Sequence, residues 1–215
     1  MEIKMKFDGI ILDIDGTIWN TTEVVAQAWN QTFEKYFPQI TPVTPDILKG
    51  QFGKTMDIIA DNLFGDLNPK DRKFLLEQCC FAEQKALVSN KNDITYPGVI
   101  ETLHQLYYRI PLFIVSNCQK GYIELVMQKN NITKLIKDYE CFGNTGLPKD
   151  KNICSIIKRN KLKNPIYVGD TQGDSDACKK AGIPFIYAAY GFGSVNDKDC
   201  YAKINLFSEL IKIIE

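Results

Sequence analysis

The uneven distribution of strand-forming segments constrains the fold of this chain more than any other feature. Residues 7–13 form a short apolar run that predicts a buried strand ending on a carboxylate. No strand signal follows between residues 20 and 93, whereas short apolar strands alternate with helices from residue 96 onward. Such alternation is typical of a parallel α/β sheet that helices cover on both faces. We therefore expect an α/β chain with a block of helices inserted after its first strand.

The inserted block and the alternating region are assigned to separate domains. Within the block, hydrophobic spacing and proline breaks predict helices at residues 21–37, 45–48, 54–64 and 71–88. Beyond it we expect strands at residues 110–115, 165–168 and 183–188, a short segment near 139–142, and helices at 96–108, 121–130, 150–160, 174–181 and 206–214. We place the helical domain at residues 17–92 and the sheet domain at residues 1–16 and 93–215.

Composition and charge exclude several classes of protein. The 215 residues are 45% hydrophobic and 24% charged, which is ordinary for a folded domain. The 26 basic residues equal the 26 acidic ones, which argues against a general nucleic-acid binder. No stretch approaches the roughly 20 apolar residues of a membrane span, and residues 1–6 lack the apolar run of a secretory signal. Seven scattered cysteines without a CxxC pair then indicate reduced thiols in a cytoplasmic protein.

Polar side chains follow three of the predicted strands at the point where each strand ends. The three strand ends read Asp13-Ile14-Asp15-Gly16-Thr17, Ser116-Asn117 and Gly169-Asp170-Thr171-Gln172-Gly173-Asp174. Lys149 opens the helix between the second and third of these strands. Ligands bind at the carboxyl ends of the strands in open α/β sheets. If these ends lie side by side, one site holds four carboxylates, a hydroxyl group and an ammonium group.

Such a cluster of carboxylates favours a divalent cation and phosphate chemistry. Carboxylates packed together repel one another, so that one pKa would rise unless a cation intervened. Mg²⁺ is the common cation for oxygen ligands, and it usually takes only one or two carboxylates, which leaves another free for chemistry. A carboxylate beside Mg²⁺, with lysine and serine to hold an anion, suits phosphoryl transfer through an aspartyl-phosphate. Turn chemistry explains a single Asp-Gly pair, but not all four elements in this order.

On these motifs the chain resembles the haloacid dehalogenase-like (HAD) superfamily, in the branch of phosphoglycolate phosphatases and β-phosphoglucomutases. The resemblance covers nearly the whole chain. It implies a Rossmann-like parallel-sheet core with an inserted α-helical cap domain. Phosphatases and related phosphoryl transferases of the superfamily carry two aspartates two residues apart, as Asp13 and Asp15 are here. True dehalogenases lack the second aspartate, so Asp15 argues against dehalogenase activity.

The resemblance also implies a role for each motif residue. Asp13 is expected to attack phosphorus and to become the aspartyl-phosphate. Asp15 is expected to protonate the leaving oxygen and then to deprotonate the hydrolytic water. The residues expected to bind the substrate phosphate are Ser116, Lys149 and Asn117, the last through its backbone amide.

The implied metal site and the choice of lysine follow from the same motifs. The expected Mg²⁺ ligands are Asp13, the backbone carbonyl of Asp15, Asp170 and Asp174, the last in or just behind the metal shell. Lys151 is an alternative to Lys149. The apolar residues Ile153, Ile156 and Ile157 place Lys149 at the helix start on the inward side, so Lys149 is preferred.

The substrate itself is left open by these motifs. In the capped branch, the stretch with Gln51, Phe52 and Lys54 faces the core site, so these residues are possible substrate contacts, although a surface lysine is the simpler interpretation of Lys54. We expect a small phosphorylated metabolite as the partner, no nucleic-acid or membrane partner, and a monomer or homodimer.

The favoured function is a Mg²⁺-dependent phosphatase that works through an aspartyl-phosphate. One alternative is a phosphomutase of the β-phosphoglucomutase type, and another is a regulatory protein that binds phosphate without turnover. Members similar to β-phosphoglucomutase carry a histidine in the first cap helix, and the aligned position here is Val25. The only histidine, His104, falls in the core domain. Because valine cannot form that hydrogen bond, the hydrolase is preferred over the mutase.

Overall fold

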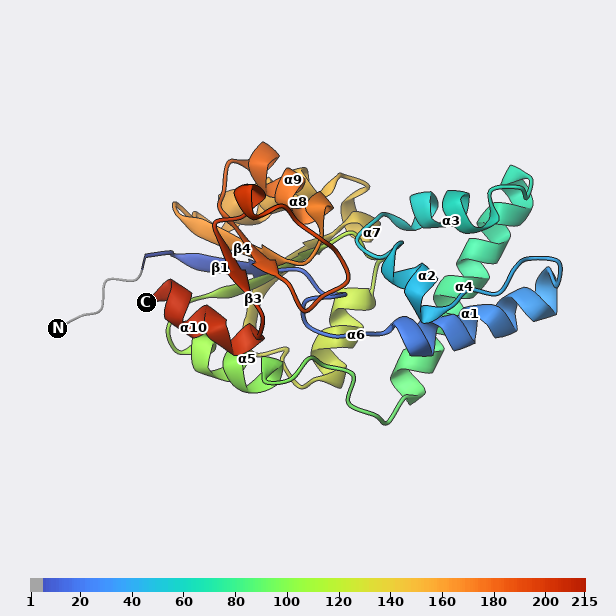
Figure 1. The fold of residues 1–215 in the computed structure, drawn as a ribbon, viewed down its shortest axis with the longest axis horizontal. Coiled ribbons are helices and arrows are strands. Elements are labelled where there is room, and N and C mark those ends of the chain that lie inside the picture. The colour runs from blue at the N-terminus through green and yellow to red at the C-terminus, as the bar shows by residue number, and fades with distance from the viewer. Residues whose placement is uncertain (1–5) are drawn as a thin grey trace.

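The computed structural model describes residues 6–215, so residues 1–5 of the predicted sheet domain lie outside the described part. A parallel sheet with helices on both faces forms one side of the molecule, and a lobe of helices forms the other (Figure 1). Within residues 6–215, none of the helices is both long enough and apolar enough to cross a membrane.

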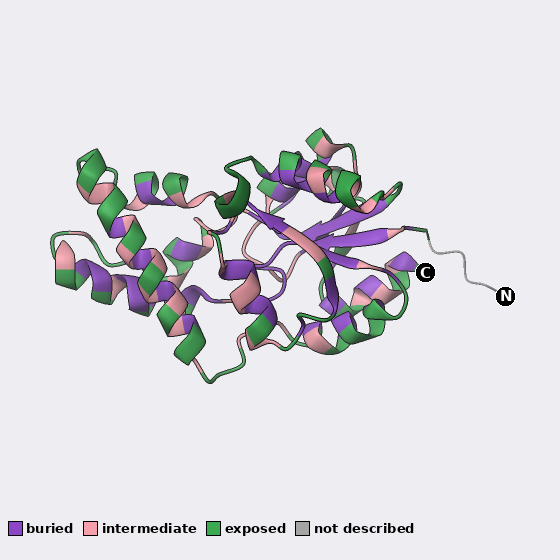
Figure 2. Ribbon diagram, turned by 180° about the vertical axis from the view of Figure 1, so that it is seen from behind, coloured by how far each residue is buried: buried purple, intermediate pink, exposed green. Residues whose placement is uncertain are grey.

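Six parallel strands form the sheet, in the order β3-β2-β1-β4-β5-β6. They are β1 (Gly9–Leu12), β2 (Leu112–Ser116), β3 (Ile136–Cys141), β4 (Pro165–Gly169), β5 (Phe185–Ala188) and β6 (Ala202–Ile204). The first strand lies in the middle, where Ile10 pairs with Leu112 on one side and with Ile166 on the other. A central parallel strand is covered on both faces, which is why all four residues of β1 are buried (Figure 2).

Helices of the sheet region pack on both of its faces. They are α5 (Val99–Tyr107), α6 (Tyr122–Lys129), α7 (Phe142–Thr145), α8 (Lys149–Asn160), α9 (Gln172–Ala181) and α10 (Leu210–Ile214). Ile10 and Leu12 of β1 join a core with α5, α6 and α10, whereas Ile11 joins a second core with α8 and α9. This alternation follows from the two-residue period of a strand, which sends successive side chains to opposite faces. The predicted Rossmann-like α/β core is confirmed.

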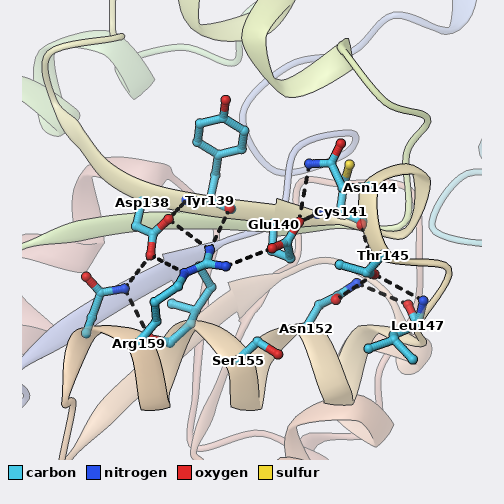
Figure 3. A network of polar contacts seen from close by, with 12 residues as sticks. Asp138, Tyr139, Glu140, Cys141, Asn144, Thr145, Leu147, Asn152, Ser155 and Arg159 are labelled. Carbon is cyan, nitrogen blue, oxygen red and sulfur yellow. Dashed lines mark hydrogen bonds and ion pairs between the residues drawn. The ribbon is translucent and has the colours of Figure 1, made fainter.

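Helix α8 is tied to the edge strand β3 by a polar network (Figure 3). Arg159 donates from Nε to Asp138 Oδ2 at 2.8 Å and from Nη1 to Glu140 Oε2 at 2.9 Å. At the other end of the helix, Asn152 donates to the carbonyl of Leu147 at 3.0 Å. Both ends of α8 are therefore anchored, which fixes the position of the residue that opens it.

The helical lobe consists of α1 (Thr22–Tyr36), α2 (Pro45–Lys49), α3 (Met56–Phe64) and α4 (Pro69–Ser89). It has an apolar core of its own, which includes Trp29, Phe33 and Leu75. Each fully buried side chain of this size contributes about 1.5–3 kcal/mol, so the lobe has its own source of stability. The exact boundaries proposed for the two domains, at 16/17 and 92/93, remain a prediction.

The structure also differs from the sequence expectations in detail. The region between residues 20 and 93 contains no strand, as predicted. Strand β6 was not predicted, because it has only three residues and a single buried one. Residues 206–214 were predicted as one helix, but they begin with a 3₁₀ turn, Phe207–Glu209, before α10. Strand β3 is longer than the predicted segment, and its partly exposed edge position explains its mixed polarity.

Candidate active site

The turn after β1 brings the first two aspartates against the end of β4. The strand pairing continues one residue past β1, where the backbone N–H of Asp13 donates to the carbonyl of Val168 at 2.9 Å. Gly16 then turns the chain with φ of +83°, and a Cβ at this position would lie 2.1 Å from Asp170 Oδ2. Only glycine combines this backbone conformation with so close an approach. The Asp15-Gly16 pair therefore forms a turn and also lets the backbone lie directly against Asp170.

Three buried carboxylates gather at this edge of the sheet. Asp13, Asp170 and Asp174 each offer an oxygen within 4.8 Å of the others. Lys149 lies among them, with its Nζ 3.0 Å from Asp13 Oδ1 and 2.5 Å from Asp174 Oδ1. Its side chain is only 4% exposed, whereas that of Lys151 is 63% exposed and pairs with Asp150. The structure thus places Lys149 within the cluster of three aspartates and Lys151 at the surface.

The pKa values of these groups show how strongly they interact. Burial raises the pKa of Asp13 to about 7, a shift that Lys149 opposes and Asp174 increases. Burial, Asp174 and Asp13 together raise the pKa of Asp170 well above its ordinary value. Burial by itself would lower the pKa of Lys149, but Asp13 and Asp174 outweigh it and raise that pKa. A single lysine does not balance three carboxylates, so the group favours a further cation.

The hydrogen bonds show which oxygens are free for a cation. Asp174 forms a capping box at the start of α9, where its Oδ2 accepts from the backbone and the hydroxyl of Thr171. Asp170 Oδ2 accepts from the backbone N–H of Phe192 at 2.7 Å. Asp170 Oδ1, in contrast, is buried without a partner among the described residues. An unpartnered buried oxygen beside two other carboxylates fits a hard cation such as Mg²⁺.

Asp15 has a different environment from the three clustered carboxylates. Its Oδ1 accepts from Trp19 Nε1 at 3.1 Å, Thr21 Oγ1 at 3.0 Å and Tyr122 Oη at 2.7 Å. Burial raises the pKa of Asp15 to about 6, although these three hydrogen bonds oppose the shift. Its carboxylate is not a member of the metal-sized cluster. The side chain is thus held in one orientation, and its pKa lies close to neutral pH, as a general acid–base group requires.

A small cavity of about 30 Å³ joins the strand ends to the helical lobe. Its lining residues are Asp13, Asp15, Phe52, Gly53, Lys54, Met56, Ile59, Glu83, Ser116, Asn117, Cys118, Gln119 and Tyr122. Of the expected cap contacts, Phe52 and Lys54 line it, whereas Gln51 does not and accepts from Lys54 at 3.0 Å. A larger groove of about 660 Å³ lies between α1 and α4, but it has no Asp, Glu, Cys or His in its lining.

The lobe closes on the sheet through several contacts around this cavity. The side chain of Asn117 donates from Nδ2 to the carbonyl of Gly53 at 2.8 Å. Gln119 donates from Nε2 to Glu83 Oε1 at 3.0 Å, and the rings of Phe52 and Phe192 meet edge to face. A cavity of this volume holds only one or two water molecules, so the lobe must move to admit a substrate.

Sequence reasoning did not identify several residues at this site. Trp19, Thr21 and Tyr122 orient Asp15, Phe192 contacts Asp170, and Glu83 is a lobe carboxylate in the cavity wall. Only the strand-end position of a residue gives a local signal in the sequence. These residues come from helices and loops whose side chains reach the site through tertiary packing.

A model of the haloacid dehalogenase-like hydrolase family matches residues 10–188. The chain belongs to this family. It is 23% identical to a phosphoglycolate phosphatase of Vibrio parahaemolyticus, over 95% of each chain. It is 24% identical to a phosphoglycolate phosphatase of Agrobacterium fabrum, over 86% of this chain and 82% of that protein. The predicted membership of the superfamily is confirmed.

Solved structures show the same fold. A predicted phosphoglycolate phosphatase from Haemophilus somnus superimposes with a TM-score of 0.85 at 21% identity, over 97% of this chain and 98% of that chain. A predicted phosphatase from Clostridium acetobutylicum gives a TM-score of 0.82 at 17% identity, with the same coverage. At these identities the similarity establishes the fold of this chain and does not establish its substrate.

Proposed function

We propose that this chain is a Mg²⁺-dependent phosphatase that hydrolyses small phosphorylated metabolites through an aspartyl-phosphate on Asp13. The observation that carries the proposal is the buried contact of Lys149 with Asp13 and Asp174, beside an oxygen of Asp170 that has no partner among residues 6–215. A buried nucleophile, a fixed ammonium group and a cation site within a few ångströms are the parts that phosphoryl transfer needs. Five curated relatives of comparable length are named phosphoglycolate phosphatase, which supports the same reaction class.

The reaction has two steps in this proposal. Asp13 attacks phosphorus, the bond from phosphorus to the leaving oxygen breaks, and Asp15 gives that oxygen a proton. Water then attacks the aspartyl-phosphate, Asp15 takes a proton from it, and inorganic phosphate leaves with Asp13 restored. Ser116 and Lys149 hold the phosphoryl oxygens, and the backbone amide of Asn117 is a further donor.

The cluster of three aspartates fits Mg²⁺, the metal that the family implies. Asp13, Asp170 and the backbone carbonyl of Asp15 would hold Mg²⁺, with Asp174 in or behind the shell. When bound, Mg²⁺ offsets the negative charge of the carboxylates and of the phosphoryl group. Asp174 is the weaker candidate for a direct ligand, because both of its oxygens already accept hydrogen bonds.

Release of phosphate from p-nitrophenyl phosphate tests the proposal. We expect turnover with Mg²⁺, loss of activity in excess EDTA and recovery when Mg²⁺ is restored. Ca²⁺ should substitute poorly, because it prefers a larger and more flexible set of ligands. Undiminished activity after exhaustive chelation would contradict the metal requirement. A folded protein with no turnover at all would instead support the regulatory, phosphate-binding alternative.

A phosphomutase is the other alternative for the same aspartyl-phosphate chemistry. Val25, at the position of the mutase histidine, is fully buried in the core of the helical lobe and offers no polar group. We therefore expect water to reach the intermediate. Incubation with β-glucose 1-phosphate and glucose 1,6-bisphosphate should yield inorganic phosphate without accumulating glucose 6-phosphate. Faster formation of glucose 6-phosphate than of inorganic phosphate would favour the mutase.

The cellular setting is part of the same proposal. All seven cysteines are free, which is compatible with a reducing cytoplasm. We also propose a monomer or homodimer, which size-exclusion chromatography with light scattering distinguishes.

A further inference from the structure

The helical lobe contributes one carboxyl group, that of Glu83 on α4, to the wall of the cavity. Glu83 is only 4% exposed. Its Oε2 accepts from Trp29 Nε1 at 3.1 Å, within the lobe, and its Oε1 accepts from Gln119 Nε2 at 3.0 Å, across the boundary with the sheet. The carboxyl group is therefore held in place from both sides of the closed site.

Burying this carboxyl group is unfavourable for folding, because its ionised form loses its hydration. Burial raises the pKa of Glu83 to about 7, and the nearby Asp15 adds to the shift that Gln119 and Trp29 oppose. None of the described residues forms a salt bridge with it. The reaction steps on Asp13 and Asp15 do not use it either. A buried acid that has hydrogen-bond donors but no charged partner, in the wall of the cavity beside Asp13 and Asp15, is a group whose charged or donor partner is to be expected in the ligand.

A second acceptor lies in the same cavity wall. Asn117 donates through Nδ2 to the carbonyl of Gly53, and this contact assigns the other end of the amide as the oxygen. That oxygen, Oδ1, is buried without a partner among residues 6–215. The cavity wall thus contains the carboxyl group of Glu83 and, on Asn117, a buried oxygen without a partner among residues 6–215, in addition to the residues of the phosphate chemistry.

Lys54 is the basic residue in the lining of this cavity, but its ammonium group is hydrogen-bonded to acceptors of the lobe. It is exposed, and its Nζ donates to the carbonyl of Gly50 at 2.8 Å and to Gln51 Oε1 at 3.0 Å. Both acceptors belong to the lobe. A negatively charged leaving group would therefore meet the carboxyl group of Glu83 in this wall, whereas the ammonium group of Lys54 already has acceptors in the lobe.

From this arrangement we infer that the site selects phosphate monoesters whose leaving group carries a hydrogen-bond donor, an ammonium or a hydroxyl group, and that Glu83 disfavours a carboxylate there. The inference rests on the proposed phosphatase function and specifies its substrate class. An ammonium group gains most, because it offers donors and a charge opposite to that of Glu83. Phe52, Met56 and Ile59 form the apolar part of the wall.

Three phosphates that share a two-carbon leaving group test this selection. They are 2-phosphoglycolate, 2-hydroxyethyl phosphate and O-phosphoethanolamine, which differ in having a carboxylate, a hydroxyl or an ammonium group at the far carbon. At pH 8, where most of Glu83 is ionised, we expect kcat/KM to be highest for the ammonium compound and lowest for the carboxylate. The reverse order would overturn the inference.

Glu83→Gln isolates the contribution of the charge. Relative to 2-hydroxyethyl phosphate, we expect kcat/KM for 2-phosphoglycolate to rise about tenfold and that for O-phosphoethanolamine to fall about tenfold, as for one close charge pair in a partly solvated site. Glu77→Gln, an exposed glutamate on the same helix, is the matched control and should leave both ratios unchanged. Unchanged ratios in the Glu83→Gln variant, with the fold intact by circular dichroism, would refute the role of Glu83.

Binding separates this inference from the proposed function. The affinities of the three phosphates for the Asp13→Asn variant, measured by calorimetry with Mg²⁺ and with Glu83 intact, should follow the same order. If that order holds but the unmodified protein releases no phosphate from any ester, the inference stands and the phosphatase function fails. If the protein is an active phosphatase but the order is absent or reversed, the function stands and the inference fails. Absence of binding for all three, together with no release of phosphate from any ester by the unmodified protein, would refute both.

Discussion

Buried carboxyl groups have different kinds of partner at the end of the sheet and in the helical lobe. At the sheet end, carboxylates are concentrated, and a buried lysine contacts two of them. In the lobe, whose core is apolar, one acid, Glu83, is buried, and its partners are one neutral amide and one indole. The first arrangement stabilises charge for chemistry, whereas the second leaves one charge for a ligand to meet. The proposed reactivity and the inferred selectivity therefore depend on different parts of the molecule.

Removing the nucleophile should separate the two regions most sharply. Asp13→Asn should lower phosphate release by at least about 10³-fold, because the aspartyl-phosphate can no longer form. The binding order of the three two-carbon phosphates should persist, since Glu83 is untouched. Phosphate release and circular dichroism measure the effect. Near-normal turnover in a folded variant would show that another group is the nucleophile.

The two lysines at the start of α8 offer a test within the sheet region. Lys149→Ala should lower kcat/KM by about ten- to a hundredfold, since a charge-assisted contact to phosphate is worth about 1.5–3 kcal/mol. Lys151→Ala is the matched control, and because its side chain is 63% exposed we expect less than a twofold effect. Steady-state kinetics of both variants decides between them. A larger effect at Lys151 would reverse the assignment.

Tyr122→Phe should change the pH dependence of the sheet site while leaving selection by the lobe intact. The tyrosine hydroxyl donates to Asp15 and stabilises its ionised form, so its removal raises the pKa of Asp15 further above its ordinary value. Protonation of the leaving group needs the protonated acid. The alkaline limb of kcat/KM for an alkyl phosphate should therefore move up by about half to one pH unit.

The substrate p-nitrophenyl phosphate provides the control for this variant. Its leaving group is stable without a proton, so its alkaline limb should not depend on Asp15. Equal shifts for both substrates would show that Tyr122 acts on binding or on the fold and not through Asp15.

The smallest effect is expected on the sheet but away from the site, at the network between β3 and α8. Burial tends to raise the pKa of Asp138, but hydrogen bonds from Arg159 and Asn160 outweigh it and lower that pKa. A lowered pKa in the folded state means that Asp138 stabilises the fold above its unfolded pKa and loses this contribution as the pH falls through the folded value. Asp138→Asn should therefore cost about 1 kcal/mol near pH 7 and progressively less below about pH 4.

Urea unfolding at pH 7 and at pH 3 measures how much free energy of unfolding the variant loses at each pH. The ratio of kcat/KM values among the three two-carbon phosphates should stay constant in the variant. A destabilisation that is the same at pH 7 and pH 3 would mean that the ionised Asp138 is not what stabilises the fold.

The amino-acid sequence determined the parts of this protein that depend on local order along the chain. Strand and helix periods are local, so the α/β alternation and the strand-free stretch between residues 20 and 93 could be predicted. Carboxyl ends of parallel strands meet at one edge, so the sequence also predicted that Asp13, Asp170 and Asp174 would share a site with Lys149. Strand β6 escaped prediction because three residues with one buried side chain carry too little pattern.

Only the tertiary structure decided which distant residues complete the site. Tyr122 lies 107 positions from Asp15, and Gln119 lies 36 positions from Glu83, yet each pair forms a hydrogen bond. No period or spacing in the sequence encodes these pairs, because the first depends on how α6 packs beside the turn after β1 and the second on how the helical lobe packs against the sheet region. A glutamate on a helix is usually solvated, and Glu83 is buried because α4 packs against α1 and against the segment between β2 and α6. The residues of the proposed chemistry could therefore be predicted from their order along the chain, whereas the inferred basis of selectivity depends on packing.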